Sequence, residues 1–119
     1  MTNTAATPKK TVAIIGGGPA GLMAAEALSQ AGMAVDVYDA MPSVGRKFLL
    51  AGIGGLNITH SEPYDAFCLR YGPERHDLQA SLDCFTPDNL RHWTNDHGIE
   101  TFIGTSGRVF PKEMKAAPL

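Results

Sequence analysis

The chain has 119 residues, of which 44% are hydrophobic and 18% are charged, and its formal net charge is −2. These values exclude a collagen-like, a disordered and a strongly basic nucleic-acid-binding protein. No apolar run reaches the roughly 18 residues that a membrane-spanning helix needs. The two cysteines, Cys68 and Cys84, are too few for a disulfide framework. We therefore expect a cytoplasmic protein that has neither nucleic acid nor a membrane as its partner.

The first elements of the chain alternate strand, helix and strand. Residues 1–10 show no apolar periodicity and are expected to form a flexible tail. The apolar run over 11–15 is typical of a strand covered on both faces. Residues 19–31 are good helix formers, with Gly32 as a left-handed stop, and residues 34–39 predict a second buried strand. A strand–helix–strand unit requires a parallel pair with a right-handed crossover.

The middle of the chain, at about 62–98, predicts a helical segment after an irregular, glycine-rich stretch over 40–60. Its helices are expected over 63–71 with Ser61 as cap, over 74–85, and over 87–97 with Thr86 as cap. Phe85, Trp93 and both cysteines are expected in the core. Residues 99–103 and 108–110 predict two short strands joined by a glycine turn.

The predicted sheet is incomplete, because only two long parallel strands are present and a sheet covered on both faces needs more neighbours. A helix-like stretch begins at Pro111 and continues to the last residue. We interpret residues 11–119 as the N-terminal portion of a domain of the α/β class, a parallel sheet with flanking helices. The partner expected for it is the remainder of its own longer chain.

A dinucleotide fingerprint, Gly16-x-Gly18-x-x-Gly21, follows the first predicted strand and opens the first helix. Gly16 allows a tight turn, Gly18 lets a pyrophosphate approach the backbone, and Gly21 allows close packing of helix on strand. The free N–H groups of the helix then face the phosphates. The alternative interpretation is an ordinary strand–loop–helix turn whose glycines serve packing alone.

Asp39 follows Gly21 by 18 residues and ends the second predicted strand. An acidic residue at this place accepts hydrogen bonds from the ribose hydroxyls of an adenosine. A 2′-phosphate would favour a basic residue, so Asp39 indicates a site for NAD or FAD rather than NADP. The residues of the crossover alone leave NAD and FAD open, since both contain the same ADP half.

Three further motifs carry a resemblance to a known family. They are Gly45-Arg46-Lys47-Phe48-Leu49-Leu50-Ala51-Gly52, Gly54-Gly55-Leu56-Asn57-Ile58-Thr59-His60-Ser61-Glu62 and Gly107-Arg108-Val109-Phe110-Pro111. Together with the fingerprint they resemble the bacterial aminoacetone-oxidase-type, FAD-dependent flavoproteins of the two-dinucleotide-fold class. The resemblance implies a Rossmann-like FAD/NAD(P)-binding domain, of which residues 11–119 are the N-terminal portion. It also implies FAD as cofactor and a whole protein several times longer than this chain. In much of that family the segment equivalent to Gly55-Leu56-Asn57 reads Gly-Arg-Cys-Asn. In this chain leucine replaces the cysteine and glycine replaces the arginine, which points to a sub-branch.

The residues between 45 and 57 suit a cofactor site by their own chemistry. Arg46 and Lys47 offer cations beside the expected ribose site, while Gly52, Gly54 and Gly55 let backbone pass close to a planar ligand. The alternatives are a solvated basic pair and a flexible surface loop. The candidate cofactor-binding residues are Gly16, Gly18, Pro19, Ala20, Gly21, Asp39, Ala40, Gly45, Arg46, Lys47, Gly54, Gly55 and Asn57.

The sequence predicts no metal site and identifies no catalytic residue. His92 and His97 would lie about 140° apart around a helix and cannot share a metal ion, and His60 is expected to be a surface histidine.

We expect a flavin-dependent oxidoreductase that transfers hydride through non-covalent FAD. Its partners would be a small-molecule amine or carbonyl substrate and NAD(P)H, and the 119-residue piece alone would be inactive. The alternative is a non-catalytic module that binds or senses an adenine dinucleotide, NAD or FAD.

Overall fold

The computed structural model describes residues 9–51 and 53–119. The expected flexible tail, apart from residues 9 and 10, and Gly52 therefore lie outside the described residues. The chain divides into two compact units, one ending at Phe48 and one spanning Leu49–Leu119.

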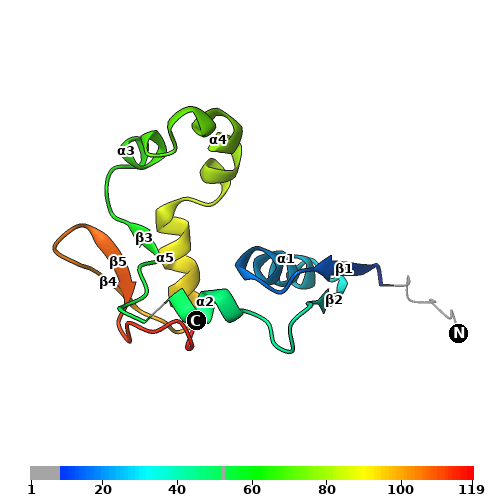
Figure 1. Ribbon diagram of the computed structural model, residues 1–119. Coiled ribbons are helices and arrows are strands. Elements are labelled where there is room, and N and C mark those ends of the chain that lie inside the picture. The colour runs from blue at the N-terminus through cyan, green and yellow to red at the C-terminus, as the bar shows by residue number, and fades with distance from the viewer. Residues whose placement is uncertain (1–8, 52) are drawn as a thin grey trace, which may run out of the picture. The chain divides into compact units, whose positions relative to one another are not determined.

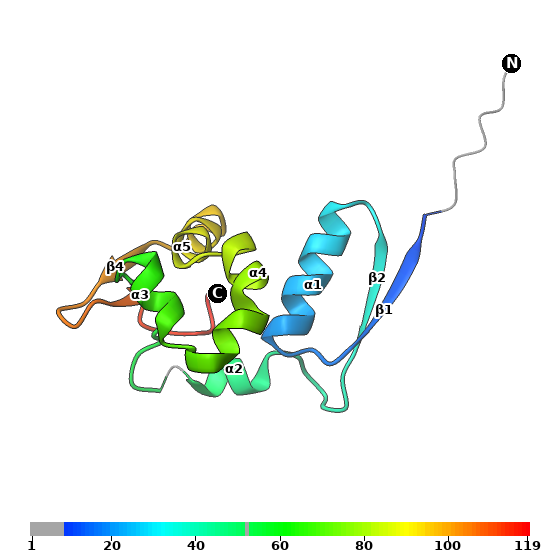
Figure 2. The ribbon, with the colours of Figure 1, turned by 90° about the horizontal axis from the view of Figure 1, so that it is seen from above.

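The first unit is the predicted strand–helix–strand crossover (Figure 2). Its elements are β1 (Thr11–Ile15), α1 (Pro19–Gln30) and β2 (Ala34–Tyr38). The two strands pair in parallel, with Thr11 opposite Ala34 and Ile15 opposite Tyr38. Helix α1 ends before Gly32, which has a φ of +84° and so supplies the left-handed stop that the sequence predicts.

Helix α1 covers one face of the strand pair. The side chains of Val12 and Ile14 are half-buried, and Ile14 lies next to Gly21 of α1. On the opposite face, Ile15 is 83% exposed and Tyr38 is 57% exposed. The expectation of strands covered on both faces is thus wrong within the described residues, because a single helix covers the pair.

The second unit combines helices with a three-stranded antiparallel sheet in the order β3-β5-β4 (Figure 1). Its strands are β3 (Thr59–His60), β4 (Thr101–Ile103) and β5 (Arg108–Pro111), and its helices are α3 (Tyr64–Leu69), the 3-10 turn η1 (Gly72–Glu74), α4 (Arg75–Cys84) and α5 (Pro87–Asp96). Helix α2 (Arg46–Ala51) crosses the boundary between the units. Val109, on the central strand, is fully buried. The buried apolar residues described in this unit are Leu56, Cys68, Ile99, Val109, Pro111 and Ala116.

The ends of α5 follow the sequence prediction. The Thr86 side chain accepts a hydrogen bond from the backbone N–H of Asn89, and the Asn89 side chain accepts one from the backbone N–H of Thr86. This reciprocal pair is a capping box, and Pro87 occupies the first helical position. Gly98 follows the helix with a φ of +77°.

Several local expectations are wrong. Ser61 does not cap α3, because its hydroxyl donates to the carbonyl of Gly107 while Pro63 occupies the cap position. Phe85 is 41% exposed and Cys84 is exposed, since both lie at the end of α4. The stretch after Pro111 forms turns rather than a helix, and α2 forms within the stretch expected to be irregular.

Replacing the capping threonine should destabilise the second unit. In Thr86→Ala one helix N–H loses its acceptor, so we expect the free energy of unfolding to fall by about 1 kcal/mol. Thr105→Ala, at an exposed position of the β4–β5 turn, is the matched control. Urea denaturation checks the prediction, which equal unfolding free energies for the two variants would contradict.

Candidate functional site

The turn between β1 and α1 is built by glycines with separate tasks. Gly16 continues the strand pairing, since its N–H donates to the carbonyl of Tyr38 at 2.7 Å. Its φ of +106° lies in the region that L side chains rarely adopt. Gly16 therefore allows the chain to leave the sheet sharply at the end of β1.

Gly21 is the point of closest approach between α1 and the strand. A Cβ atom at this position would lie 1.9 Å from the carbonyl oxygen of Gly16, which no real contact permits. At Gly18, by contrast, a Cβ would meet nothing within 4 Å. Gly21 is thus required by packing within the protein, whereas the space beside Gly18 is open.

The N-terminus of α1 has no side-chain cap for the backbone N–H groups of its first turn. Gly18 occupies the cap position and supplies no side-chain acceptor, Pro19 starts the helix, and no acidic residue lies in the first turn. The first intrahelical bond runs from the N–H of Leu22 to the carbonyl of Gly18. Backbone N–H groups of the first turn, such as that of Ala20, have no intrahelical acceptor, and the positive end of the helix dipole is not neutralised by a carboxylate of that turn.

Asp39 follows β2 and is hydrogen-bonded to two backbone N–H groups. Its Oδ1 accepts from Met41 at 2.8 Å and its Oδ2 accepts from Gly17 at 2.7 Å. These two bonds, with a smaller contribution from the nearby Arg46 charge, hold the pKa of Asp39 below its ordinary value of 3.8. The residue is exposed, so its ionised carboxylate remains accessible to a ligand.

Gly17 is a residue of the site that the sequence analysis missed. It is buried, and a Cβ on it would lie 2.4 Å from Cγ1 of Val44. Its carbonyl accepts a hydrogen bond from the N–H of Gly45 at 2.7 Å. The fingerprint leaves this position free, and only the packing of Val44 reveals why glycine is needed here.

The remaining candidates of the first unit surround Asp39. Ala40 directly follows it and is exposed, and Gly45 has a φ of +70°. Arg46 donates from Nη1 to the hydroxyl of Ser43 at 3.1 Å. Lys47 is exposed. The structure thus brings Gly16, Gly18, Gly21, Asp39 and Gly45 into one region.

Gly54, Gly55 and Asn57 belong to the second unit. Nδ2 of Asn57 donates to the carbonyls of Thr59 at 2.7 Å and Val109 at 3.0 Å. A Cβ on Gly55 would lie 2.5 Å from Cε of Met114. The two hydrogen bonds of Asn57 therefore hold this loop to its own sheet, and Met114 fills the space beside Gly55. Gly54 is open, with nothing within 4 Å of a Cβ.

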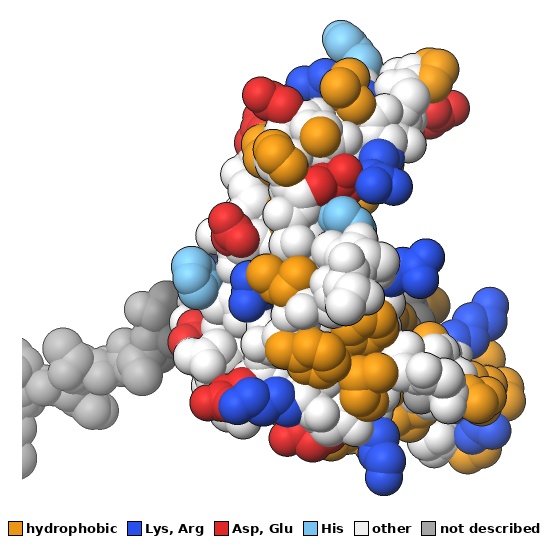
Figure 3. Space-filling model, turned by 90° about the vertical axis from the view of Figure 1, so that its left-hand side faces the viewer, with side chains coloured by type: hydrophobic (Ala, Val, Ile, Leu, Met, Phe, Trp, Pro, Cys, Tyr) orange, Lys and Arg blue, Asp and Glu red, His pale blue; other side chains and the backbone are white. Residues whose placement is uncertain are grey.

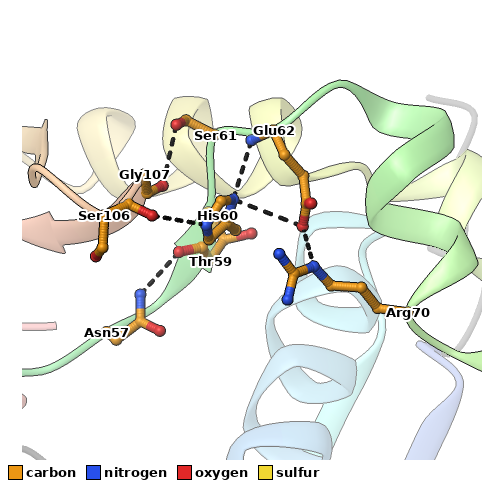
Figure 4. A network of polar contacts seen from close by, with 8 residues as sticks. All are labelled: Asn57, Thr59, His60, Ser61, Glu62, Arg70, Ser106 and Gly107. Carbon is orange, nitrogen blue, oxygen red and sulfur yellow. Dashed lines mark hydrogen bonds and ion pairs between the residues drawn. The ribbon is translucent and has the colours of Figure 1, made fainter.

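His60 joins β3 to the β4–β5 turn (Figure 4). Its Nε2 lies 3.0 Å from the carbonyl of Ser106, and its Nδ1 accepts from the N–H of Glu62 at 3.1 Å. Glu62 also forms an ion pair with Arg70. The side chain of His60 is 25% exposed. These contacts give His60 a structural task in the second unit.

Two hollows lie in the second unit and do not include the glycine turn. One, of about 430 Å³, is lined by side chains of α5 and β4 together with Glu100 and Lys112, and the other, of about 710 Å³, lies along η1 and α4. The first is lined by both acids and bases, of which Glu100 and Lys112 form an ion pair. Across the described residues, no three His, Cys, Asp or Glu side chains gather to hold a metal ion, and no helix is long and apolar enough to cross a membrane.

A match to a family model decides the classification. The model of the HI0933-like protein Rossmann domain matches residues 10–119. This chain belongs to the HI0933-like family. The glycine turn and the parallel crossover are accordingly those of a Rossmann domain, a fold that binds dinucleotides.

Two curated relatives of this HI0933-like chain carry the same name. Proteins named ribosomal RNA dihydrouridine synthase are 33% identical over 100 residues in Haemophilus influenzae and 33% identical over 97 residues in Escherichia coli. These matches cover 84% and 82% of this chain. In both cases they cover only 24% of the relative, so the chain spans about a quarter of the length of these proteins.

The two fingerprint glycines should respond differently to alanine. Gly21→Ala forces α1 away from β1, so we expect it to lower the free energy of unfolding by about 1–3 kcal/mol. Gly18→Ala fills open space at the helix cap and should cost less than about 1 kcal/mol. Chemical denaturation of both variants measures the difference, and a Gly18→Ala protein as unstable as Gly21→Ala would contradict this account of the turn.

Asp39 should make stability sensitive to acid. Because its pKa is lower in the folded protein than the ordinary value of 3.8, its ionised form stabilises the fold above that value. This contribution is lost as the pH falls through the lower, folded pKa. We expect Asp39→Asn to be less stable than wild type at neutral pH, with a difference that shrinks below about pH 4.

Thermal denaturation between pH 7 and pH 2 checks this prediction. Asp36→Asn, which removes an exposed carboxylate of β2, is the control for general charge effects. A wild-type minus Asp39→Asn difference that stays constant over this range would show that the carboxylate charge has no such role.

Proposed function

We propose that this chain forms the FAD-binding, N-terminal part of a flavin-dependent oxidoreductase. The observation that carries the proposal is the open space beside Gly18 at the uncapped N-terminus of α1, with the exposed carboxylate of Asp39 after the adjacent strand. This arrangement fits the ADP half of a dinucleotide, with its pyrophosphate beside Gly18 and its ribose beside Asp39.

The pyrophosphate needs hydrogen-bond donors and a positive potential. The first turn of α1 provides N–H groups and the positive end of the helix dipole, and no side chain of that turn adds an opposing negative charge. A Cβ at Gly18 would point into open space, so the bare glycine leaves room for phosphate oxygens to approach the backbone.

The ribose needs an acceptor for its hydroxyl groups. Each oxygen of Asp39 accepts one backbone N–H, and a carboxylate oxygen has a second acceptor site. Asp39 is thereby held in place and still able to accept from a ribose hydroxyl. Arg46, close enough to lower the pKa of Asp39, would lie near the adenosine.

FAD bound in this way would supply the redox chemistry, a hydride transfer between NAD(P)H or a small organic donor and an acceptor. The chain's own residues bind and orient the ADP half. No catalytic residue is assigned among them. The family match favours a flavin over the NAD-only alternative, and a purely sensing module remains the outcome expected if the holoprotein binds the cofactor without turnover.

A second, more specific candidate is the reduction of uridine in ribosomal RNA. It is favoured by the two relatives named ribosomal RNA dihydrouridine synthase. Saturating the pyrimidine double bond consumes a hydride and a proton, which is within flavin chemistry. The formal charge of this chain is −2, and acidic and basic side chains are interspersed over the described part of the face in Figure 3. We propose that any RNA is held mainly by surfaces outside this segment.

The cofactor prediction is tested on the full-length protein. We expect the purified protein to show a flavin absorption spectrum, and Gly18→Val to lose it because a branched side chain fills the pyrophosphate position. Ala27→Val, at an exposed position of the same helix, is the control and should retain the flavin. A colourless wild-type protein that takes up no FAD on reconstitution would refute the proposal.

The substrate is distinguished by turnover of that same holoprotein. With NADPH or NADH and unmodified ribosomal RNA, dihydrouridine detected by mass spectrometry supports the second candidate. Oxidation of a small amine or carbonyl compound without dihydrouridine formation supports a small-molecule oxidoreductase instead.

A further inference from the structure

The peptide groups around Gly17 are held from two sides by the segment that follows β2. The N–H of Gly17 donates to Oδ2 of Asp39 at 2.7 Å, and its carbonyl accepts from the N–H of Gly45 at 2.7 Å. Gly17 is buried, so water does not readily replace either partner. Both backbone groups of one residue are therefore fixed by residues more than twenty positions away.

This arrangement determines the direction of the next N–H group. The carbonyl of Gly17 and the N–H of Gly18 belong to one peptide unit, which is planar and trans. In a trans peptide these two groups point in opposite directions. A hydrogen bond that fixes the Gly17 carbonyl toward Gly45 therefore fixes the Gly18 N–H away from it.

Side-chain packing restrains the same peptide. A Cβ on Gly17 would lie 2.4 Å from Cγ1 of Val44 and 3.0 Å from Oδ2 of Asp39. The φ of Gly17 is not in the left-handed region, so glycine is needed here for space rather than for backbone freedom. Val44 therefore packs against Gly17, the residue whose N–H and carbonyl form the two hydrogen bonds.

We propose that Asp39, Val44 and Gly45 are positioning residues for the phosphate-binding turn. They orient the peptide between Gly17 and Gly18 before a dinucleotide binds, so that the turn does not have to be ordered by the ligand. Asp39 then has two tasks, since it positions the turn in addition to accepting from the ribose. The role in phosphate binding rests on the proposed function, whereas the hold on Gly17 does not.

The first experiment measures the hold on Gly17 without any cofactor. Amide hydrogen exchange of Gly17 is followed in the flavin-free, full-length protein for wild type, Asp39→Asn and Asp39→Ala. The single oxygen of asparagine can still accept the Gly17 N–H, with loss of the bond from Met41, whereas alanine offers no acceptor. We expect a slowly exchanging Gly17 amide in wild type and Asp39→Asn, and exchange at least about tenfold faster in Asp39→Ala. Equal exchange in wild type and Asp39→Ala would overturn the proposal.

The second experiment uses a probe that has no ribose. Inorganic pyrophosphate competes with FAD for the same three flavin-free proteins, and FAD binding is followed by flavin fluorescence. Both variants lack the negative charge, so a difference between them reports the orientation of the turn. We expect pyrophosphate to bind about tenfold more weakly to Asp39→Ala than to Asp39→Asn. Equal binding would show that Asp39 acts on the ribose alone and would overturn the positioning role.

A second pair of variants covers the case in which Asp39→Ala does not fold. Gly17→Ala should weaken FAD binding because its Cβ meets Val44, and adding Val44→Gly should restore part of the affinity, a coupling that two independent sites would not show. Additive effects would overturn the proposal.

A wild-type protein that keeps a protected Gly17 amide but binds neither FAD nor pyrophosphate would refute the proposed function, and with it the role in phosphate binding.

Discussion

The hydrogen bond between the Asp39 carboxylate and the Gly17 N–H joins the two ends of the crossover. Each strand of the parallel pair ends at the same edge of the sheet, so the turn after β1 and the segment after β2 meet there. A charged acceptor makes this a stronger bond than a neutral one. The open Gly18 backbone, the free first turn of α1 and the accessible Asp39 carboxylate all depend on this junction for their mutual placement.

The crossover could be predicted from sequence because its causes are local. The apolar run of β1, the glycines and the helix formers of α1 each favour one structure. Glycine is needed at position 21 because α1 passes close to the carbonyl of Gly16. Gly17 could not be predicted in this way. Its constraint comes from Val44, which lies 27 positions further along the chain, and no spacing rule links the two.

The second unit shows the same division between local and long-range causes. The Thr86 cap of α5 and the glycine turn between β4 and β5 depend on neighbouring residues, and the sequence predicts both. Asn57 suits a ligand by its chemistry, yet its amide donates to Val109, 52 positions away. Ser61 has the short hydroxyl side chain typical of a helix cap. That hydroxyl instead donates to the carbonyl of Gly107, the residue before β5.

The contact between His60 and Gly107 has a consequence for how such chains can change over time. A Cβ at position 107 would lie 2.7 Å from Cε1 of the His60 ring, and Gly107 has a φ of +81°. A larger residue at 107 therefore requires the ring at 60 to move or to be exchanged for a smaller side chain, and it also strains the backbone at 107. In proteins that share an ancestor with this chain, we expect the residues at positions 60 and 107 to change together.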